Sequence, residues 1–155
     1  MSISTAVAVA DDILKIAKQK NISLAPLQLM KLVYIAHGWS LALLNDDLFA
    51  DRIEAWKYGP IVPELYHATK RFGRDHIPRE VIGDDSSYSL SGDALELVKQ
   101  VVEKYGHLTG YRLSQMTHRA GTPWSQLYKE GCYGIEIPDD VIKTHYKELA
   151  RARAS

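Results

Sequence analysis

Residues 24–44 restrict the fold more than any other part of the chain, because nearly all of them are apolar. At about 100° per residue, the polar side chains of this segment do not gather on one face of a helix; they are Gln28, Lys31, His37 and Ser40. A helix that has no polar side is normally buried all round. The segment is long enough to span a bilayer, but its proline, glutamine, lysine and histidine would be costly in hydrocarbon. We therefore expect the central helix of a globular domain and no membrane span.

Further helices are expected on both sides of this segment. Apolar residues recur at helical spacing in residues 6–17 and again in residues 95–105. Proline is tolerated in the first helical turn, and three more helices are expected to start at Pro63, Pro123 and Pro138. Ser23 is expected to cap the central helix, and Gly38 is expected to let another element approach that helix closely.

A short β-hairpin is expected after the central helix. Residues 48–50 and 53–56 are separated only by Asp51 and Arg52, and these two runs are predicted to pair with each other. Gly59-Pro60 then predicts a turn, and the polar residues 74–88 predict a surface loop with room for a brief strand.

The sequence thus predicts a mainly α protein that forms a single compact domain. We expect about six to seven helices, with a short β-hairpin near residues 48–57. No internal repeat or long linker divides the chain, so this one domain should occupy residues 1–155, with its core at about residues 5–150.

Composition limits the class of protein. Of the 155 residues, 19 are Lys or Arg and 19 are Asp or Glu, so no net charge attracts the chain to nucleic acid or to an anionic membrane. A single cysteine, Cys132, excludes an internal disulfide and zinc sites built from several thiolates. The first ten residues lack the basic start of a secretory signal. These features predict a cytoplasmic protein that needs neither a disulfide nor a metal to fold.

The common catalytic motifs are missing from the sequence, including phosphate loops, Gly-x-Ser-x-Gly and His-Glu-x-x-His. Glu64 and His67 have the spacing of di-iron ligands, but no second pair exists, so His67 is expected to be a surface or packing residue. Asp51, Glu54 and Lys57 resemble the residues of a metal nuclease, although their spacing turns Lys57 to the opposite face of a strand. We expect no enzyme and no catalytic, metal or cofactor site, and we keep a nuclease as an alternative.

Residues 113–127 predict a helix, a turn and a second helix, an arrangement found in many DNA-binding proteins. The second helix offers Trp124, Gln126, Tyr128 and Lys129, so only one positive charge is available for phosphate. A structural corner is therefore favoured, and nucleic acid is not an expected partner. A DNA-binding transcriptional regulator stays open as an alternative.

Tyrosine and tryptophan are the residues most typical of protein interfaces, and this chain carries many of them. The most prominent are Tyr34, Trp39, Trp56, Tyr58, Tyr66, Tyr111, Trp124 and Tyr133. We expect half or more of these to lie in the core, and Trp39 on the central helix in particular. Trp56 and Tyr58, which flank Lys57, are the better interface candidates.

Three stretches of the chain together resemble the Panacea domain family. They are KLVYIAHGW at residues 31–39, IEAWKYGPIVPELY at residues 53–66, and LSQMTH at residues 113–118 with Pro123-Trp124. The family includes phage-associated GepA-like proteins, and SocA-like proteins that act as antitoxin and protease adaptor. The similarity covers nearly the whole chain.

The resemblance implies an antitoxin that neutralises a cognate protein toxin by direct binding. The toxin would be encoded by an adjacent gene, and its fold cannot be inferred from the antitoxin domain. A SocA-like member instead delivers its toxin to the ClpXP protease, so a proteolytic adaptor is an alternative. A homodimer also stays open. Either role is that of a binding protein and not of a catalyst.

The resemblance also implies which residues bind the toxin or support the interface. They are Trp56, Lys57, Tyr58, Gly59, Pro60, Glu64, His67, His118 and Trp124. A domain with varied partners should keep its scaffold constant and not its contacts, so Trp56 and Trp124 could belong to either group. Alanine at Tyr58 or Glu64 is expected to lower toxin binding with little loss of thermal stability.

Overall fold

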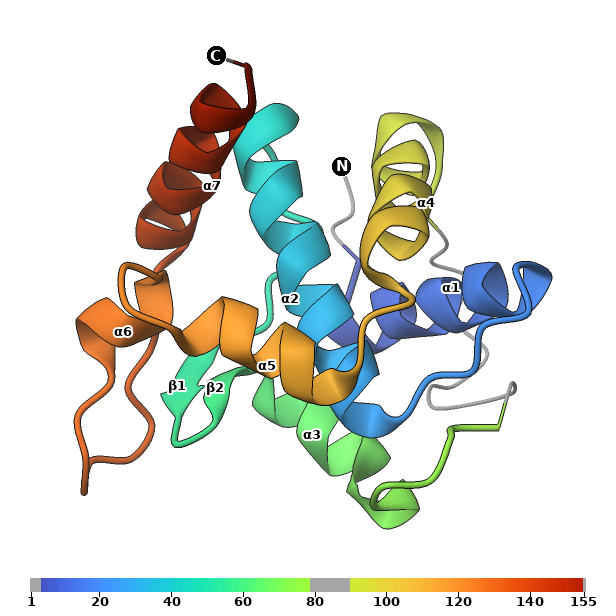
Figure 1. The fold of residues 1–155 in the computed structure, drawn as a ribbon, viewed down its shortest axis with the longest axis horizontal. Coiled ribbons are helices and arrows are strands. Elements are labelled where there is room, and N and C mark those ends of the chain that lie inside the picture. The colour runs from blue at the N-terminus through green and yellow to red at the C-terminus, as the bar shows by residue number, and fades with distance from the viewer. Residues whose placement is uncertain (1–3, 79–89, 155) are drawn as a thin grey trace.

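The computed structural model describes residues 4–78 and 90–154, which are arranged around one helix, α2 (Figure 1). In chain order the elements are α1 (Ala6–Gln19), α2 (Pro26–Leu43), β1 (Glu54–Trp56), β2 (Gly59–Ile61), α3 (Pro63–Thr69), the 3₁₀ helix η1 (Lys70–Phe72), α4 (Gly92–Tyr105), α5 (Gly110–His118), α6 (Pro123–Leu127) and α7 (Asp139–Ala154). The prediction of a mainly helical single domain with one short hairpin is confirmed.

Helix α2 is the central helix of the domain, as predicted from its lack of a polar face. Every residue from Leu29 to Leu41 is buried, because α1, α4, α5 and α7 all pack against it. Within the described residues, no helix has both the length and the apolar character that a bilayer crossing requires.

The start of α2 differs from the prediction that Ser23 caps it. Ala25 is the N-cap residue, and its backbone N–H donates to the side chain of Gln28 at 2.9 Å. Pro26 explains the difference, because a proline keeps the residue before it extended and so makes that residue the cap. Gln28 also donates to the Leu108 carbonyl at 3.1 Å, which ties the helix start to the loop before α5.

At Gly38, α7 approaches α2 closely, as the sequence predicts for some neighbouring element. A Cβ atom on Gly38 would lie 2.3 Å from Cε2 of Tyr146 on α7. The Tyr146 ring also packs edge to face on Trp39, with centroids 5.0 Å apart. The glycine is therefore required by packing.

The hairpin exists, but its strands are not the predicted ones. Strand β1 pairs with β2 in the register Glu54↔Ile61, Ala55↔Pro60 and Trp56↔Gly59, so Lys57 and Tyr58 form the turn. The predicted pairing of residues 48–50 with residues 53–56 is wrong, and Gly59-Pro60 lies in a strand and not in a turn.

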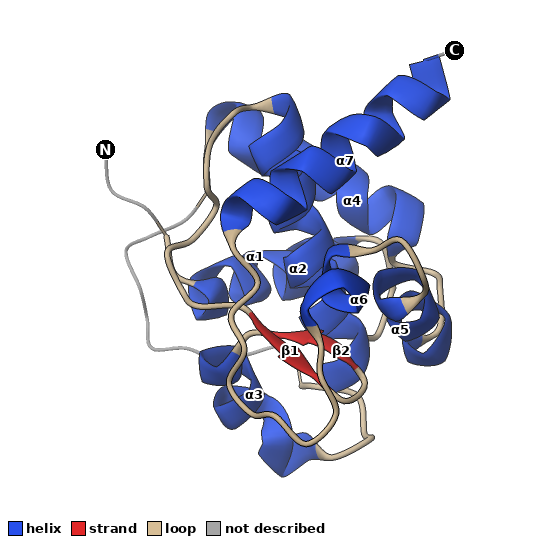
Figure 2. Ribbon diagram, turned by 90° about the vertical axis from the view of Figure 1, so that its left-hand side faces the viewer, coloured by secondary structure: helices blue, strands red, loops and turns tan. Residues whose placement is uncertain are grey.

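Burial explains the change of partner. Leu48 and Phe49 are both buried in the core, and Phe49 bridges to Ser4 instead of to β1. Residues 135–137 lie along the edge of β1 that faces away from β2. The Ala55 N–H donates to the Ile135 carbonyl and the Ile137 N–H donates to the Ile53 carbonyl, each at 2.8 Å. The hairpin lies between α3 on one side and α5 with α6 on the other (Figure 2).

The polar residues predicted to form a loop are described only in part. Residues 74–78 are irregular, and Ile77 N–H donates to the Leu24 carbonyl at 2.8 Å. Residues 79–88 of the predicted loop, with any brief strand there, lie outside the described residues.

Candidate protein-binding surface

The turn of the hairpin is held by a buried lysine from α2. Lys31 is 0% exposed, and its ammonium group donates to the carbonyl oxygens of Pro60 at 2.9 Å and Tyr58 at 3.4 Å. Burial lowers the pKa of Lys31 to about 7. In the described part of the chain, these carbonyls are its hydrogen-bond acceptors, and no carboxylate pairs with it.

Gly59 makes this contact sterically possible. Its φ of +118° lies in a region that side chains rarely adopt, and a Cβ atom there would lie 2.7 Å from the Lys31 nitrogen. Gly59 of the predicted motif therefore leaves the space that the Lys31 side chain of the central helix occupies.

Two further side chains bind carbonyls of the same turn. Ser114 on α5 donates to the Tyr58 carbonyl at 2.9 Å, and the Trp124 indole on α6 donates to the Trp56 carbonyl at 2.5 Å. His118 packs edge to face on Trp124, with ring centroids 5.2 Å apart. The three stretches that carry the family resemblance thus meet at one turn.

The predicted site residues fall into two sets by burial. Gly59 and Pro60 are buried, and Trp124 and His118 are half-buried behind the turn. Lys57, Tyr58, Glu64 and His67 are exposed, and Tyr58 is 68% exposed. Trp56 is half-buried as well; its indole donates to Glu54 at 2.9 Å and its ring packs on Tyr66.

An apolar hollow of about 520 Å³, the hairpin hollow, lies beside the turn. It is lined by Pro26, Leu27, Met30, Trp56, Lys57, Tyr58, Ile61, Tyr66, Thr69, Lys70 and Gly73. These residues come from α2, the hairpin, α3 and η1, so only the tertiary structure brings them together. The hollow is within the size range of sites that bind small molecules or the side chains of a partner.

Sequence reasoning missed the roles of Lys31 and Ser114 and the hollow itself. A lysine inside an otherwise apolar helix was the available signal, because a buried ammonium group requires polar partners. The identity of those partners depends on a turn far away in the sequence.

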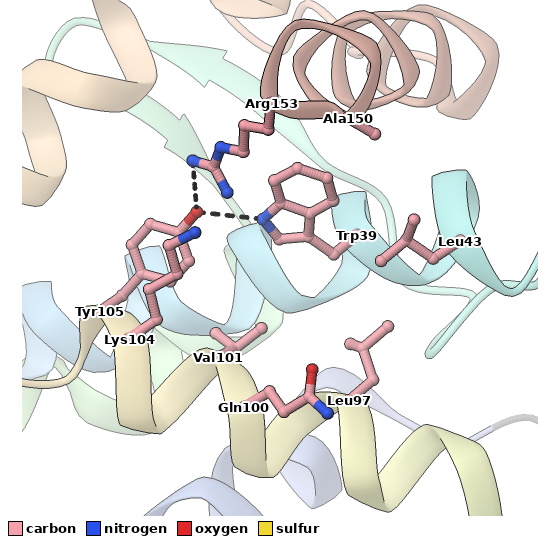
Figure 3. Close-up of a pocket in the computed structure, with 9 residues that line it drawn as sticks. All are labelled: Trp39, Leu43, Leu97, Gln100, Val101, Lys104, Tyr105, Ala150 and Arg153. Atoms are coloured by element: carbon pink, nitrogen blue, oxygen red, sulfur yellow. Dashed lines mark hydrogen bonds between the residues drawn. The ribbon is translucent and has the colours of Figure 1, made fainter. Parts of the chain in front are cut away.

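A second and smaller hollow, the α7 hollow, has a volume of about 250 Å³ and lies between α2, α4 and α7 (Figure 3). It is lined by Trp39, Leu43, Leu97, Gln100, Val101, Lys104, Tyr105, Ala150 and Arg153. The Tyr105 hydroxyl accepts hydrogen bonds from the Trp39 indole and from Arg153, each at 3.2 Å. Trp39 is 6% exposed, so the prediction that it belongs to the core is confirmed.

The three residues that resemble a metal nuclease have separate partners. Asp51 accepts a hydrogen bond from the Ala6 N–H at the start of α1, at 2.9 Å. Glu54 pairs with Arg52 at 2.9 Å, and Lys57 lies on the exposed turn. Asp51 and Glu54 therefore have separate structural contacts, and the three residues do not form one cluster.

In the part of the chain that the structure describes, one other group has the geometry to hold a cation. Ligand atoms of His37, Asp47 and Asp139 lie within 4.8 Å of one another, and His37 Nε2 is 2.9 Å from Asp139. The hydrogen bond from His37 lowers the pKa of Asp139, whereas partial burial and the adjacent Asp139 raise the pKa of Asp47. His37 Nδ1 is buried without an acceptor, although metal-bound histidines almost always donate with their second nitrogen. The contact is better explained as a link between α2 and α7.

The predicted helix-turn-helix exists, but its second helix is short. Helix α6 has 5 residues, and the indole of Trp124 points to the Trp56 carbonyl. Helix α5 packs against α2 and β2. This geometry is that of the structural corner favoured by the sequence.

Comparisons with known proteins bear on the same region. A family model described as "Antitoxin SocA-like, Panacea domain" matches residues 29–125, which include Lys31, the hairpin, Ser114 and Trp124. The curated protein "Antitoxin SocA" from Caulobacter vibrioides (strain NA1000 / CB15N) is 30% identical over 152 residues, covering 90% of this chain and 81% of that protein. No solved structure gave a significant match.

Proposed function

Because the chain belongs to the family of SocA-like antitoxins with a Panacea domain, we propose that it neutralises a protein toxin by binding it directly. The toxin is the product of an adjacent gene, and the complex forms in the cytoplasm. On this proposal the protein acts by binding and not by catalysis.

The observation that carries the proposal is an exposed tyrosine on a rigid turn. Tyr58 is 68% exposed, while its own carbonyl accepts hydrogen bonds from Ser114 and Lys31. Because the backbone of this turn is already held, binding does not have to order it, and less of the contact energy is lost to conformational entropy. Tyrosine is also a frequent source of binding energy at protein interfaces.

The burial of the predicted residues supports separate roles for the exposed and the buried ones. Lys57, Tyr58, Glu64 and His67 are exposed, and we propose that they contact the toxin. Gly59, Pro60, His118 and Trp124 support the turn from behind, and Trp56 does both. Stable protein interfaces bury about 1,600 Å² in total, so the contact must extend beyond the turn over the hairpin hollow and α3.

Neutralisation by occlusion and delivery of the toxin to ClpXP both require the complex. They differ in what happens to the toxin afterwards. Under occlusion the toxin half-life is unchanged or longer when the antitoxin is present, whereas delivery shortens it only in cells that contain the protease. A pulse-chase measurement with and without ClpXP separates the two.

The proposal is tested by co-expression with the product of the adjacent gene, scoring growth rescue and co-purification together. The Tyr58→Ala variant should reduce the affinity of the complex by about tenfold or more, as expected for an interface tyrosine. Leu43→Ala is the matched control, because Leu43 is 60% exposed but lies at the α7 hollow. A harmless neighbour that does not co-purify would refute the proposal.

A further inference from the structure

The hairpin hollow has an apolar lining that remains open to solvent. Leu27 is 41% exposed and Tyr66 is 39% exposed at its edge, while Met30 and Ile61 are buried beneath them. A cavity of about 150 Å³ holds benzene, so 520 Å³ has room for two or three large side chains. Concave apolar hollows of this size are the usual form of binding sites.

The edge of the same hollow is positively charged. Lys57 and Lys70 line it, and no carboxylate does so in the described part of the chain. Both lysines are exposed, and among the described residues neither ammonium group is paired with an acid. Because the chain as a whole has no net charge, this local excess of positive charge is a property of the hollow.

We propose that the hairpin hollow binds a segment of the toxin in which large apolar side chains are flanked by carboxylates. The inference rests on the proposed function, and it adds the chemistry of the partner. Apolar side chains fill the space over Met30 and Ile61, and carboxylates on either side pair with Lys57 and Lys70. The charges set the orientation and speed of association, and the buried apolar groups supply most of the affinity.

The lining favours a peptide over a nucleic acid. Nucleic-acid sites combine exposed ring faces with many cations, because each neutralised phosphate adds to the affinity. Here Leu27, Met30 and Ile61 add aliphatic surface to the aromatic rings of the lining, and among the described residues its cations are Lys57 and Lys70.

The experiment uses the folded 155-residue chain and a phage-displayed library of random peptides. Peptides enriched on the chain are synthesised and titrated by calorimetry against the double variant Lys57→Glu/Lys70→Glu. The matched control is Lys104→Glu, because Lys104 also lies over a tyrosine ring beside an apolar hollow, 5.8 Å from the Tyr105 centroid. Leu27→Ser and Leu43→Ser make the same comparison for the apolar lining.

We expect enriched peptides that combine Leu, Phe or Trp with neighbouring Asp or Glu. Their affinity should fall about tenfold or more in the double variant and should weaken with salt, because exposed charge pairs are screened. Leu27→Ser should weaken binding, whereas Lys104→Glu and Leu43→Ser should not. Circular dichroism establishes that each variant is folded, which is expected because all five substituted side chains lie at the surface.

Three results would overturn the inference. The enriched peptides could lack acidic residues or bind the double variant equally well. The chain could self-associate in a manner that the double variant abolishes, which would make a second copy the occupant. It could instead bind short DNA through Lys57 and Lys70 with a steep dependence on salt.

The same variants separate this inference from the proposed function. If the adjacent gene product co-purifies equally with wild type and with the double variant, neutralisation by binding stands, but neither Lys57 nor the hairpin hollow belongs to the interface. If acidic apolar peptides bind as expected but the neighbour neither kills cells nor co-purifies, the site stands and the antitoxin proposal fails.

Discussion

The hairpin hollow and the α7 hollow lie at opposite ends of α2 and are built from similar parts. Each has an exposed leucine of α2 and a tryptophan in its lining. Each also has a lysine over a tyrosine ring, at 5.5 Å for Lys57 on Tyr58 and 5.8 Å for Lys104 on Tyr105. Composition alone does not distinguish them.

The two hollows differ in which groups accept the hydrogen bonds at their edges. At the α7 hollow, Trp39 and Arg153 donate to the Tyr105 hydroxyl, and Arg153 lies 5.0 Å from the Trp39 ring. The tyrosine side chain is therefore already occupied and buried. At the hairpin hollow the donors bind backbone carbonyls, so Tyr58 stays exposed on a fixed turn. Hydrogen bonds to backbone carbonyls fix the turn and leave its side chains available for a partner. Hydrogen bonds to a side chain make that side chain unavailable.

The largest effect is expected from Gly59→Ala, which should lower the free energy of unfolding by about 2–4 kcal/mol. Backbone strain at positive φ costs about 1–3 kcal/mol, and displacing Lys31 removes the hydrogen bond that it donates to the buried Pro60 carbonyl. Urea denaturation measures the change. Gly121→Ala is the control, because Gly121 has a φ of +87° but nothing within 4 Å of its Cβ position. Equal losses in the two variants would show that the Lys31 contact contributes little.

The pH dependence of stability tests Lys31 directly. Its pKa of about 7 lies below the ordinary value of 10.5, so between these values the unfolded chain binds a proton that the folded chain does not. The free energy of unfolding should therefore rise with pH in this window, by up to about 1.4 kcal/mol per pH unit from this group.

Lys31→Met should remove that slope, measured by urea denaturation between about pH 7.5 and about pH 9. Lys57→Met is the control for the loss of an exposed lysine from the same turn. A slope that is identical in wild type and in Lys31→Met would contradict the assignment.

Matched tryptophan variants compare the two hollows. Trp124→Phe and Trp39→Phe should each cost about 1–2 kcal/mol of stability, since each loses an indole donor and some packing volume. Only Trp124→Phe should also weaken binding of the adjacent gene product, because its lost hydrogen bond holds the turn. Calorimetric titration at a temperature where both variants are folded makes the comparison. Equal loss of binding in both would remove the distinction between the two ends of α2.

The smallest effect is expected from Glu64→Ala in the first turn of α3. Loss of its interaction with the helix N-terminus should cost about 0.3–1 kcal/mol. An exposed charge mainly changes the association rate, so surface plasmon resonance with the adjacent gene product should show a change in that rate. Lys104→Ala, at the α7 hollow, should leave the rate unaltered. An unchanged rate for Glu64→Ala would place that residue outside the interface.

Sequence patterns predicted most helices because their signals are local. The central helix follows from the scattered polar residues of residues 24–44, and Pro63 and Thr122-Pro123 stand at helix starts as expected. The strand pairing was not predictable in this way. Residues 48–50 have a suitable pattern for a strand, but burial of Leu48 and Phe49 in the core leaves β2 as the partner of β1.

For the candidate surface, the sequence by itself predicted a set of motif residues but not the contacts that each one makes. The motif residues were identifiable from the sequence, as was the anomaly of Lys31 in an apolar helix. Only the tertiary structure decided that Lys31 meets Pro60, 29 positions away, and that Trp124 meets Trp56, 68 positions away. The physical reason is that a buried donor must find an acceptor, and local sequence does not specify which distant carbonyl the packed helices bring to it.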